Sequence, residues 1–205
     1  MRYIIVWVLF MTSFSSLASN SKTIVVLGDS LSAGYGIDPE KSWVALLQQR
    51  LTAAQSPYQV INASISGDTS ANGWSRTPPL LKQHHPSIVV LALGANDGLR
   101  GFPVKTAQGY LEKIILACHQ IQAKVVLVGI HVPPNYGAHY AKVFHQMYHQ
   151  LAAQYQLPLL PFLLQGVATH AELIQADGLH PNALAQPIIE QHVWSVLGSQ
   201  LSANP

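Results

Sequence analysis

Apolar residues in this chain fall into two alternating patterns. Short apolar runs have the length and composition of strands; they are Thr23–Leu27, Tyr58–Ile61, Ser87–Leu93, Lys124–Ile130 and a shorter stretch near Leu159. Between them, apolar residues recur every three or four positions, as in helices. One such segment begins at Ser42, and the others are Thr106–Ile121, Ala138–Tyr155 and Ala183–Leu201. Strands that are apolar throughout are covered on both faces. The alternation therefore predicts an α/β fold, a three-layer α/β/α sandwich with a mainly parallel five-stranded sheet.

Polar and glycine residues gather directly after the apolar runs. The first run is followed by Gly28-Asp29-Ser30-Leu31-Ser32, the second by residues 62–68 and the third by Gly94-Ala95-Asn96-Asp97. A further polar group, Asp177-Gly178-Leu179-His180-Pro181-Asn182, comes late in the chain. Ligands of such sheets bind beyond the carboxyl ends of the strands. We therefore expect a functional site at this edge of the sheet.

The first 18 residues have the pattern of a signal peptide. Arg2 supplies a positive charge, an apolar stretch follows from Tyr3 to Phe14, and small residues surround Ala18. This stretch is shorter than the ~20 residues that a membrane-spanning helix needs. We expect cleavage after Ala18, a periplasmic or secreted protein without a stable membrane span, and a single domain over residues 19–205.

Composition excludes several classes of protein. The chain has 205 residues, of which 49% are hydrophobic and 10% charged, so it is not a disordered protein. Its net charge of +2 is too small to indicate a nucleic-acid partner. The single cysteine, Cys118, lies on the apolar face of a predicted helix and is expected to be a buried thiol.

Ser30, His180 and Asp177 could together perform acyl transfer. A serine nucleophile needs a base that takes its proton and a third group that orients the base. Ser30 stands where a strand ends, and among the ten histidines His180 is distinguished by Asp177 three residues earlier. At that spacing a carboxylate can reach the imidazole Nδ1 and leave Nε2 free to accept the serine proton.

The same chemistry requires hydrogen-bond donors for the oxyanion that forms during the reaction. Three sources are available after strand ends: the backbone N–H groups of Ser30 and Gly67 and the side-chain amide of Asn96. Each signal has a common structural explanation when taken alone, because Gly-Asp-Ser occurs in turns and Asp-x-x-His at helix starts. The hypothesis of a serine hydrolase site therefore rests on the order and placement of these residues along the chain.

These residues match a known family. The chain resembles the SGNH (GDSL) hydrolases over roughly residues 23–197, and within them the acyl-CoA thioesterase I, lysophospholipase and arylesterase group of Gram-negative bacteria. The segments that carry the resemblance are residues 28–36, 62–70, 96–101, 133–137 and 177–182. The resemblance implies a flavodoxin-like fold and hydrolysis of acyl esters and thioesters. It also implies that Ser30, Gly67, Asn96 and His180 are the four family residues, and that Asp177 completes the triad.

One residue near the site departs from the family pattern. Related enzymes commonly have a glycine at the position of Ala95. The additional methyl group matters if this position needs a positive φ or approaches the substrate closely. Fine specificity is therefore in question, whereas the reaction type is not.

Other catalytic classes fit the sequence less well. The segment around Ser30 lacks the second glycine of the G-x-S-x-G elbow, and Pro39 stands where a dinucleotide fingerprint needs its third glycine. His145 and His149 have a zinc-binding spacing, but Gln146 breaks the H-E-x-x-H pattern. We therefore expect no metal and no cofactor.

The substrate should be a small molecule with an acyl group, held in an apolar groove near Ser30. Candidate walls are the predicted loop over residues 73–80, with Trp74, and residues 132–136, with Pro134 and Tyr136. An exported enzyme would meet lysophospholipids and other acyl esters rather than acyl-CoA. The alternatives are a carbohydrate O-deacetylase of the same superfamily and, from a different class, a non-catalytic binding module.

Overall fold

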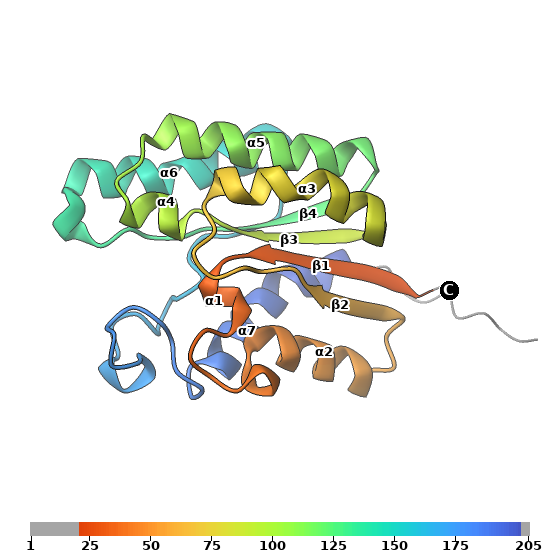
Figure 1. Ribbon diagram of the computed structural model, residues 1–205. Helices are drawn as coiled ribbons and strands as arrows, with labels where there is room; N and C mark the ends of the chain where they lie inside the picture. Colours follow the sequence, from red (N-terminus) through yellow and green to blue (C-terminus); the bar gives the residue numbers. More distant parts are fainter. Residues whose placement is uncertain (1–20, 202–205) are drawn as a thin grey trace, which may run out of the picture.

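The computed structural model describes residues 21–201 of the chain, so the predicted signal peptide lies outside the described residues. Five parallel strands form one sheet in the order β2-β1-β3-β4-β5 (Figure 1). Their bounds are Lys22–Gly28 (β1), Tyr58–Asn62 (β2), Ile88–Ala92 (β3), Lys124–Val128 (β4) and Leu159–Leu160 (β5). The predicted three-layer sandwich is confirmed, and in the described residues every strand pair is parallel.

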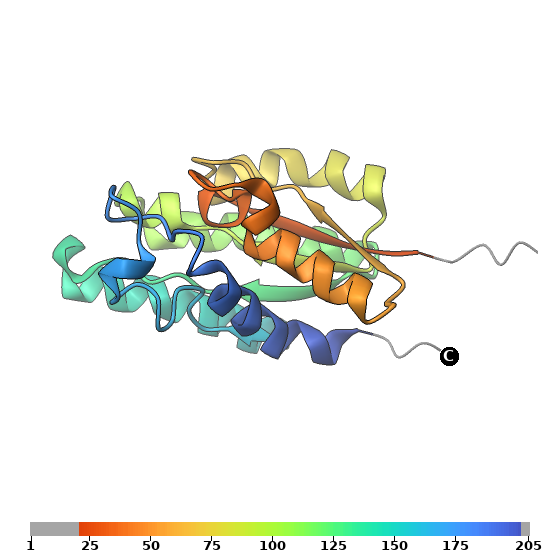
Figure 2. The same ribbon diagram turned by 90° about the horizontal axis from the view of Figure 1, so that it is seen from below.

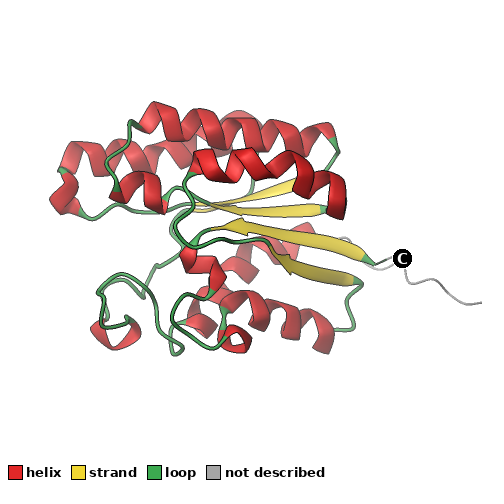
Figure 3. Cartoon of the chain, in the orientation of Figure 1, coloured by secondary structure: helices red, strands yellow, loops and turns green. Residues whose placement is uncertain are grey.

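Helices cover both faces of the sheet (Figures 1 and 3). The helices are Ser30–Ala33 (α1), Trp43–Ala53 (α2), Ser70–His84 (α3), Ala95–Leu99 (α4), Val104–Gln120 (α5), Ala138–Tyr155 (α6) and Gln186–Leu197 (α7). Helices α3, α5 and α6 lie on one face, and α2 and α7 lie side by side on the other (Figure 2). Short 3-10 helices occur at Pro39–Lys41, Pro134–Tyr136, Ala171–Leu173 and Gly198–Gln200. Within residues 21–201, no helix combines the length and the apolar content needed to span a bilayer.

Burial explains why these segments fold as the sequence predicts. All five residues of β3 are buried, as are four of the five in β4, because helices cover both sides of each strand. The hydroxyl of Ser42 caps α2 by accepting the backbone N–H of Ala45 at 3.2 Å. Cys118 is fully buried on α5, and burial raises the pKa of its thiol to about 12. The prediction of a core thiol is therefore confirmed.

One prediction was wrong: residues 73–80, expected as a loop, form the middle of α3. A capping box starts this helix, since Thr69 accepts the N–H of Asn72 and Asn72 accepts the N–H of Thr69. Pro78 and Pro79 each lack the N–H that continues a helix. Both prolines lie on the exposed side of α3, where water can hydrate the carbonyl groups that lose their donors. Packing of the other side against the sheet and α5 maintains the helix.

The strand order places a crevice at one point of the sheet. The chain leaves β1 toward β2 and then crosses back to β3 on the other side of β1. At such a switch point the connections diverge, and the crevice beyond the carboxyl ends of the two strands is where α/β folds bind ligands. Ser30 follows β1 and Asn96 follows β3, so both border this crevice.

Candidate active site

Ser30 is the first residue of α1, directly after β1. Its position depends on Asp29, whose carboxylate caps α1 by accepting the backbone N–H of Leu31 at 3.1 Å. Gly34 ends the helix after one turn in the left-handed conformation, with φ of 75°. The short helix thus holds the Ser30 hydroxyl at a defined place above the sheet.

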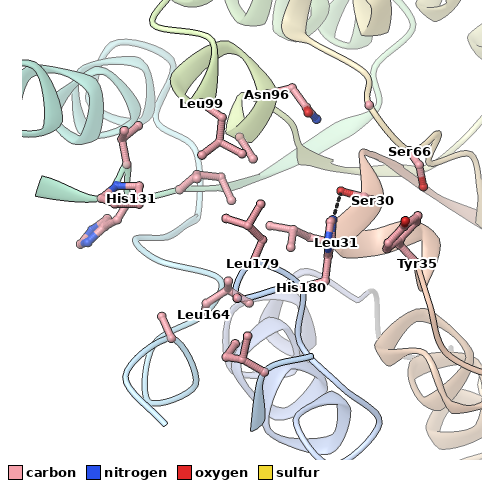
Figure 4. Close-up of a pocket in the computed structure, with 18 of the residues that line it drawn as sticks. Ser30, Leu31, Tyr35, Ser66, Asn96, Leu99, His131, Leu164, Leu179 and His180 are labelled. Carbon is pink, nitrogen blue, oxygen red and sulfur yellow. Dashed lines mark hydrogen bonds between the residues drawn. The ribbon is translucent and has the colours of Figure 1, made fainter. Parts of the chain in front are cut away.

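The structure brings the three predicted triad residues together. The Oγ of Ser30 and the Nε2 of His180 are 2.9 Å apart, shown as the dashed line in Figure 4. On the other side of the imidazole, Nδ1 lies 2.7 Å from Oδ2 of Asp177. This carboxylate also accepts the backbone N–H groups of Leu179 and His180 at 2.9 and 3.0 Å. The relay of contacts has the order that nucleophilic catalysis by serine requires.

Asp177 is held in its ionised form. Hydrogen bonds from the backbone N–H groups of His180 and Leu179, and then from the His180 side chain, lower the pKa of this carboxyl group to about 2. An ionised Asp177 accepts a hydrogen from Nδ1, which leaves the lone pair of Nε2 directed to Ser30. The imidazole is therefore oriented as a base toward the serine hydroxyl.

Two further residues hold the loop of His180 in place. Gln175 donates its backbone N–H to the carbonyl of His180 at 2.8 Å, and its side-chain amide donates to the carbonyl groups of Tyr35 and Pro181. The ring of Tyr35 lies beside the imidazole of His180, with 4.5 Å between centroids. Neither Gln175 nor Tyr35 was identified from the sequence, because their contacts join segments about 140 residues apart.

The predicted oxyanion donors also border the serine. Gly67 has φ of 85°, a left-handed conformation that favours glycine. Within the described residues, no hydrogen-bond acceptor engages the backbone N–H of Ser30 or of Gly67, so both can serve a ligand. The side-chain amide of Asn96 donates one hydrogen to the carbonyl of Asp68 at 3.0 Å, which leaves its second hydrogen available.

Buried contacts beneath these donors fix the loops after β2 and β3. Asp97 is 1% exposed and accepts the backbone N–H and the hydroxyl of Ser70 at 2.7 and 2.6 Å. Arg76 on α3 pairs with Asp68 at 2.7 Å and also donates to the carbonyl groups of Ala63 and Gly28. Because these bonds cross from α3 to both loops, they set the separation between the donors of the two loops. The sequence pattern contained no signal for Arg76, which lay within the predicted loop.

An apolar cavity of about 370 Å³ opens beside Ser30. Its lining includes Ser30, His180, Gly67, Ala95 and Asn96. The other apolar lining residues are Leu31, Leu99, Ile130, Val132, Pro133, Phe162, Leu164, Ala168, Ile174 and Leu179. Figure 4 shows leucines and His131 on one side of the Ser30–His180 pair and Tyr35 and Ser66 on the other. The site thus has a mainly apolar side and a more polar side.

Two of the three residues predicted to bind substrate, Trp74 and Tyr136, are not among the residues that line this cavity. Trp74 is on α3 and packs, partly buried, against the core, and Tyr136 is 41% exposed. Neither belongs to the cavity lining, and the backbone of Pro134 lies in the same 3-10 helix as Tyr136. Their role in substrate binding stays a prediction. Of the predicted wall over residues 132–136, Val132 and Pro133 do line the cavity.

Ala95 can now be placed. It is the first residue of α4 and is not among the residues with positive φ, a conformation that its neighbour Gly94 adopts instead, with φ of 119°. Ala95 does line the cavity beside Ser30. The backbone at this position therefore does not require a glycine, and Ala95 instead takes up a place in the cavity wall.

Comparisons with known proteins agree with this geometry. The model of the GDSL-like lipase/acylhydrolase family matches residues 26–186. The chain is 46% identical to esterase TesA of Pseudomonas aeruginosa, over 86% of this chain and 88% of TesA, and 47% identical to an arylesterase of Vibrio mimicus, over 91% and 94%. It is also 43% identical to thioesterase 1/protease 1/lysophospholipase L1 of Escherichia coli, over 88% and 86%.

Solved structures show the same similarity in three dimensions. The crystal structure of TesA superimposes with a TM-score of 0.86 at 46% identity, covering 88% of this chain and 100% of the other. The esterase EstA from Pseudoalteromonas sp., solved with monoethylphosphonate as inhibitor, gives a TM-score of 0.84 at 42% identity, covering 88% and 98%.

Proposed function

Because this chain belongs to the GDSL-like lipase/acylhydrolase family, we propose that Ser30, His180 and Asp177 are the catalytic triad of its ester hydrolysis. The chain is a serine hydrolase of esters and thioesters, since relatives that match most of its length are named esterase, arylesterase and thioesterase 1/lysophospholipase L1. The observation that supports the triad is the continuous set of contacts from Ser30 Oγ to His180 and on to Asp177, at 2.9 and 2.7 Å.

The reaction follows from these contacts. Ser30 Oγ attacks the ester carbonyl carbon while His180 Nε2 takes the hydroxyl proton, which forms a tetrahedral intermediate. The C–O bond to the leaving alcohol then breaks, and His180 returns the proton to that oxygen. Water repeats the sequence on the acyl-enzyme, so the products are the free acid and the restored serine. Asp177 keeps the imidazole oriented and stabilises its positive charge.

We propose that the oxyanion is bound by the backbone N–H groups of Ser30 and Gly67 and by the Asn96 amide. The first two donors have no acceptor within the described residues, and Asn96 keeps one hydrogen free. Donors fixed in place before the reaction stabilise the developing charge without reorganisation. The bonds from α3 to the loops of Gly67 and Asn96 support this preorganisation.

The apolar cavity favours a substrate with an acyl chain of several carbons. A cavity of about 370 Å³ with mainly apolar walls holds far more than the acetyl group that a deacetylase removes. For this reason we favour acyl esters and lysophospholipids over the alternative of a carbohydrate deacetylase. A non-catalytic binding module would not require the triad contacts.

We also propose that the chain is exported and that residues 1–18 are removed. The support is the charged, apolar and small-residue order of the N-terminal sequence. Expression of the full chain in a Gram-negative host, followed by fractionation and N-terminal sequencing, tests this. Activity in the periplasmic fraction with Ser19 as first residue is expected, whereas an uncleaved chain in the cytoplasm would refute export.

Hydrolysis of p-nitrophenyl esters from acetate to palmitate tests the catalytic proposal. The mature chain should cleave medium-chain esters with higher kcat/KM than acetate, and Ser30→Ala should lose activity on all of them. Ser75→Ala, which removes an exposed hydroxyl on α3, is the matched control. Full activity in Ser30→Ala would refute the nucleophile, and cleavage of acetate alone would support the deacetylase.

A further inference from the structure

The two sides of Ser30 differ in chemistry. On one side, the cavity walls are leucines and other apolar residues, which suit the acyl chain. On the other side, Tyr35 and Ser66 face the Ser30–His180 pair, and Tyr35 is 51% exposed (Figure 4). Since the acyl chain occupies the apolar side, the leaving group of the ester must extend to the polar side. A large and charged leaving group is therefore compatible with the site.

The charged side chains around the oxyanion donors differ in whether they have partners. The carboxylates of Asp68, Asp97 and Asp177 each accept hydrogen bonds from neighbouring side chains or backbone N–H groups. Arg100 is exposed and takes part in none of the ion pairs between described residues. It is therefore a cation at the site without a carboxylate partner in the described part of the chain.

Arg100 contacts the loop that carries one of the proposed oxyanion donors. It caps the C-terminus of α4, the helix that carries Asn96, and its Nη2 donates to the carbonyl of Gly67 at 3.2 Å. A guanidinium group has five N–H donors, and this bond uses one of them. The remaining donors form the planar fork that binds phosphate in a bidentate manner. Arg100 does not line the apolar cavity, so an anion bound by it would lie outside the space that holds the acyl chain.

We propose that Arg100 binds a phosphate group in the leaving part of the substrate. This inference rests on the proposed function and narrows its substrate class to phosphate-bearing acyl esters such as lysophospholipids. In a 1-acylglycerol 3-phosphate, five bonds of about 1.5 Å separate the ester oxygen from phosphorus, which spans about 6 Å when extended. Gly67 contributes its N–H to the oxyanion and its C=O to Arg100, and it directly follows Ser66, so the guanidinium is bonded to the loop beside which the leaving group extends.

The test compares three substrates with the same hexanoyl chain, which keeps them monomeric: 1-acylglycerol 3-phosphate, 1-acylglycerophosphocholine and monoacylglycerol. The measured quantity is the ratio of kcat/KM for each phosphate ester to that for monoacylglycerol. Arg100→Gln should lower this ratio about 10-fold, mostly through KM, because a hydrogen bond to a charged group is lost. Arg100→Lys should retain part of the ratio, and added NaCl should reduce the difference from wild type.

Lys105→Gln is the matched control, because it removes an exposed positive charge at the start of α5 without a contact to Gly67. Its ratio should stay near that of wild type. The proposal is wrong if Arg100→Gln lowers kcat/KM for all three substrates equally, which would indicate that Arg100 only positions Gly67. It is also wrong if Lys105→Gln has the same effect as Arg100→Gln. Loss of monoacylglycerol cleavage in Ser30→Ala checks the proposed function separately.

Discussion

Replacement of Asp29 by asparagine should stabilise the protein at alkaline pH. Asp29 is fully buried, and among the described residues its Oδ2 has no hydrogen-bond partner, while Oδ1 caps α1 through the N–H of Leu31. Burial raises the pKa of this carboxyl group from 3.8 to about 7, with smaller increases from the charges of Asp68 and Asp97, and the Leu31 hydrogen bond opposes the rise. An asparagine has the same shape and keeps the Oδ1 acceptor without the charge.

The magnitude follows from the pKa difference between the folded and unfolded states. Between the unfolded value of 3.8 and the folded value of about 7, the folded protein retains a proton that the unfolded chain releases. The free energy of unfolding contributed by Asp29 therefore falls as pH rises through this range and stays low above it. A difference of about three pKa units corresponds to a loss of about 4 kcal/mol at pH 8, of which only about one third is already lost at pH 5.

Urea unfolding of wild type and Asp29→Asn at pH 5 and pH 8 measures this effect. We expect the variant to be more stable than wild type, with a larger gain at pH 8 than at pH 5. Asp38→Asn is the control, because the exposed Asp38 caps a 3-10 helix through the N–H of Glu40 in the same way. An Asp29→Asn variant that is less stable than wild type at pH 8, or whose gain is equal at both pH values, would refute the reasoning.

Three other variants test the site and the fold. Asp177→Asn should lower kcat about 10⁴-fold, because the amide no longer holds the tautomer that directs Nε2 of His180 to Ser30; steady-state kinetics on p-nitrophenyl butyrate that show a loss below 10-fold would contradict this. Asn96→Ala should lower kcat about 10²–10³-fold with little change in KM, since an oxyanion donor acts in the transition state; an effect confined to KM would contradict it. Arg50→Met should reduce the free energy of unfolding by about 1–3 kcal/mol, because Glu190, whose side chain is 6% exposed, loses its ion pair at 2.7 Å. Chemical denaturation measures this change. An equal loss of stability in Arg50→Met and in the double variant Arg50→Met/Glu190→Gln would argue against a cost of burying the unpaired Glu190 carboxylate.

The helix α3 shows where local patterns mislead. Pro78 and Pro79 are strong signals against a helix, because each removes a backbone donor. The hydrogen bonds that they remove are lost on the exposed side of α3, whereas Gly73 on the buried side allows close contact with Leu93. A Cβ at Gly73 would lie 2.2 Å from Leu93 Cδ1, so the glycine also has a tertiary role. Neither the exposure of the prolines nor this contact can be derived from the spacing of apolar residues in the segment.

The walls of the cavity show a second limit. Ile130, Phe162 and Leu164 follow two different strands, and each has the apolar character of an ordinary core residue. Trp74 and Tyr136 are predicted as walls because the sequence favours loops near strand ends for their segments. Which apolar residues face a cavity depends on how the segments after β4 and β5 fold back toward Ser30. That arrangement is a property of the tertiary structure.

The sequence by itself determined the alternation of strands and helices, and with it the parallel sheet and the edge where Ser30, Asn96 and His180 gather. This was possible because the apolar pattern of each strand and helix lies within one continuous segment, and because Asp177 and His180 are only three residues apart. Only the tertiary structure decided that Asp29 is buried with no partner for Oδ2 in residues 21–201, and that Arg100 reaches Gly67. These features depend on contacts between segments that are distant along the chain, and such contacts leave no local pattern of hydrophobic and polar positions.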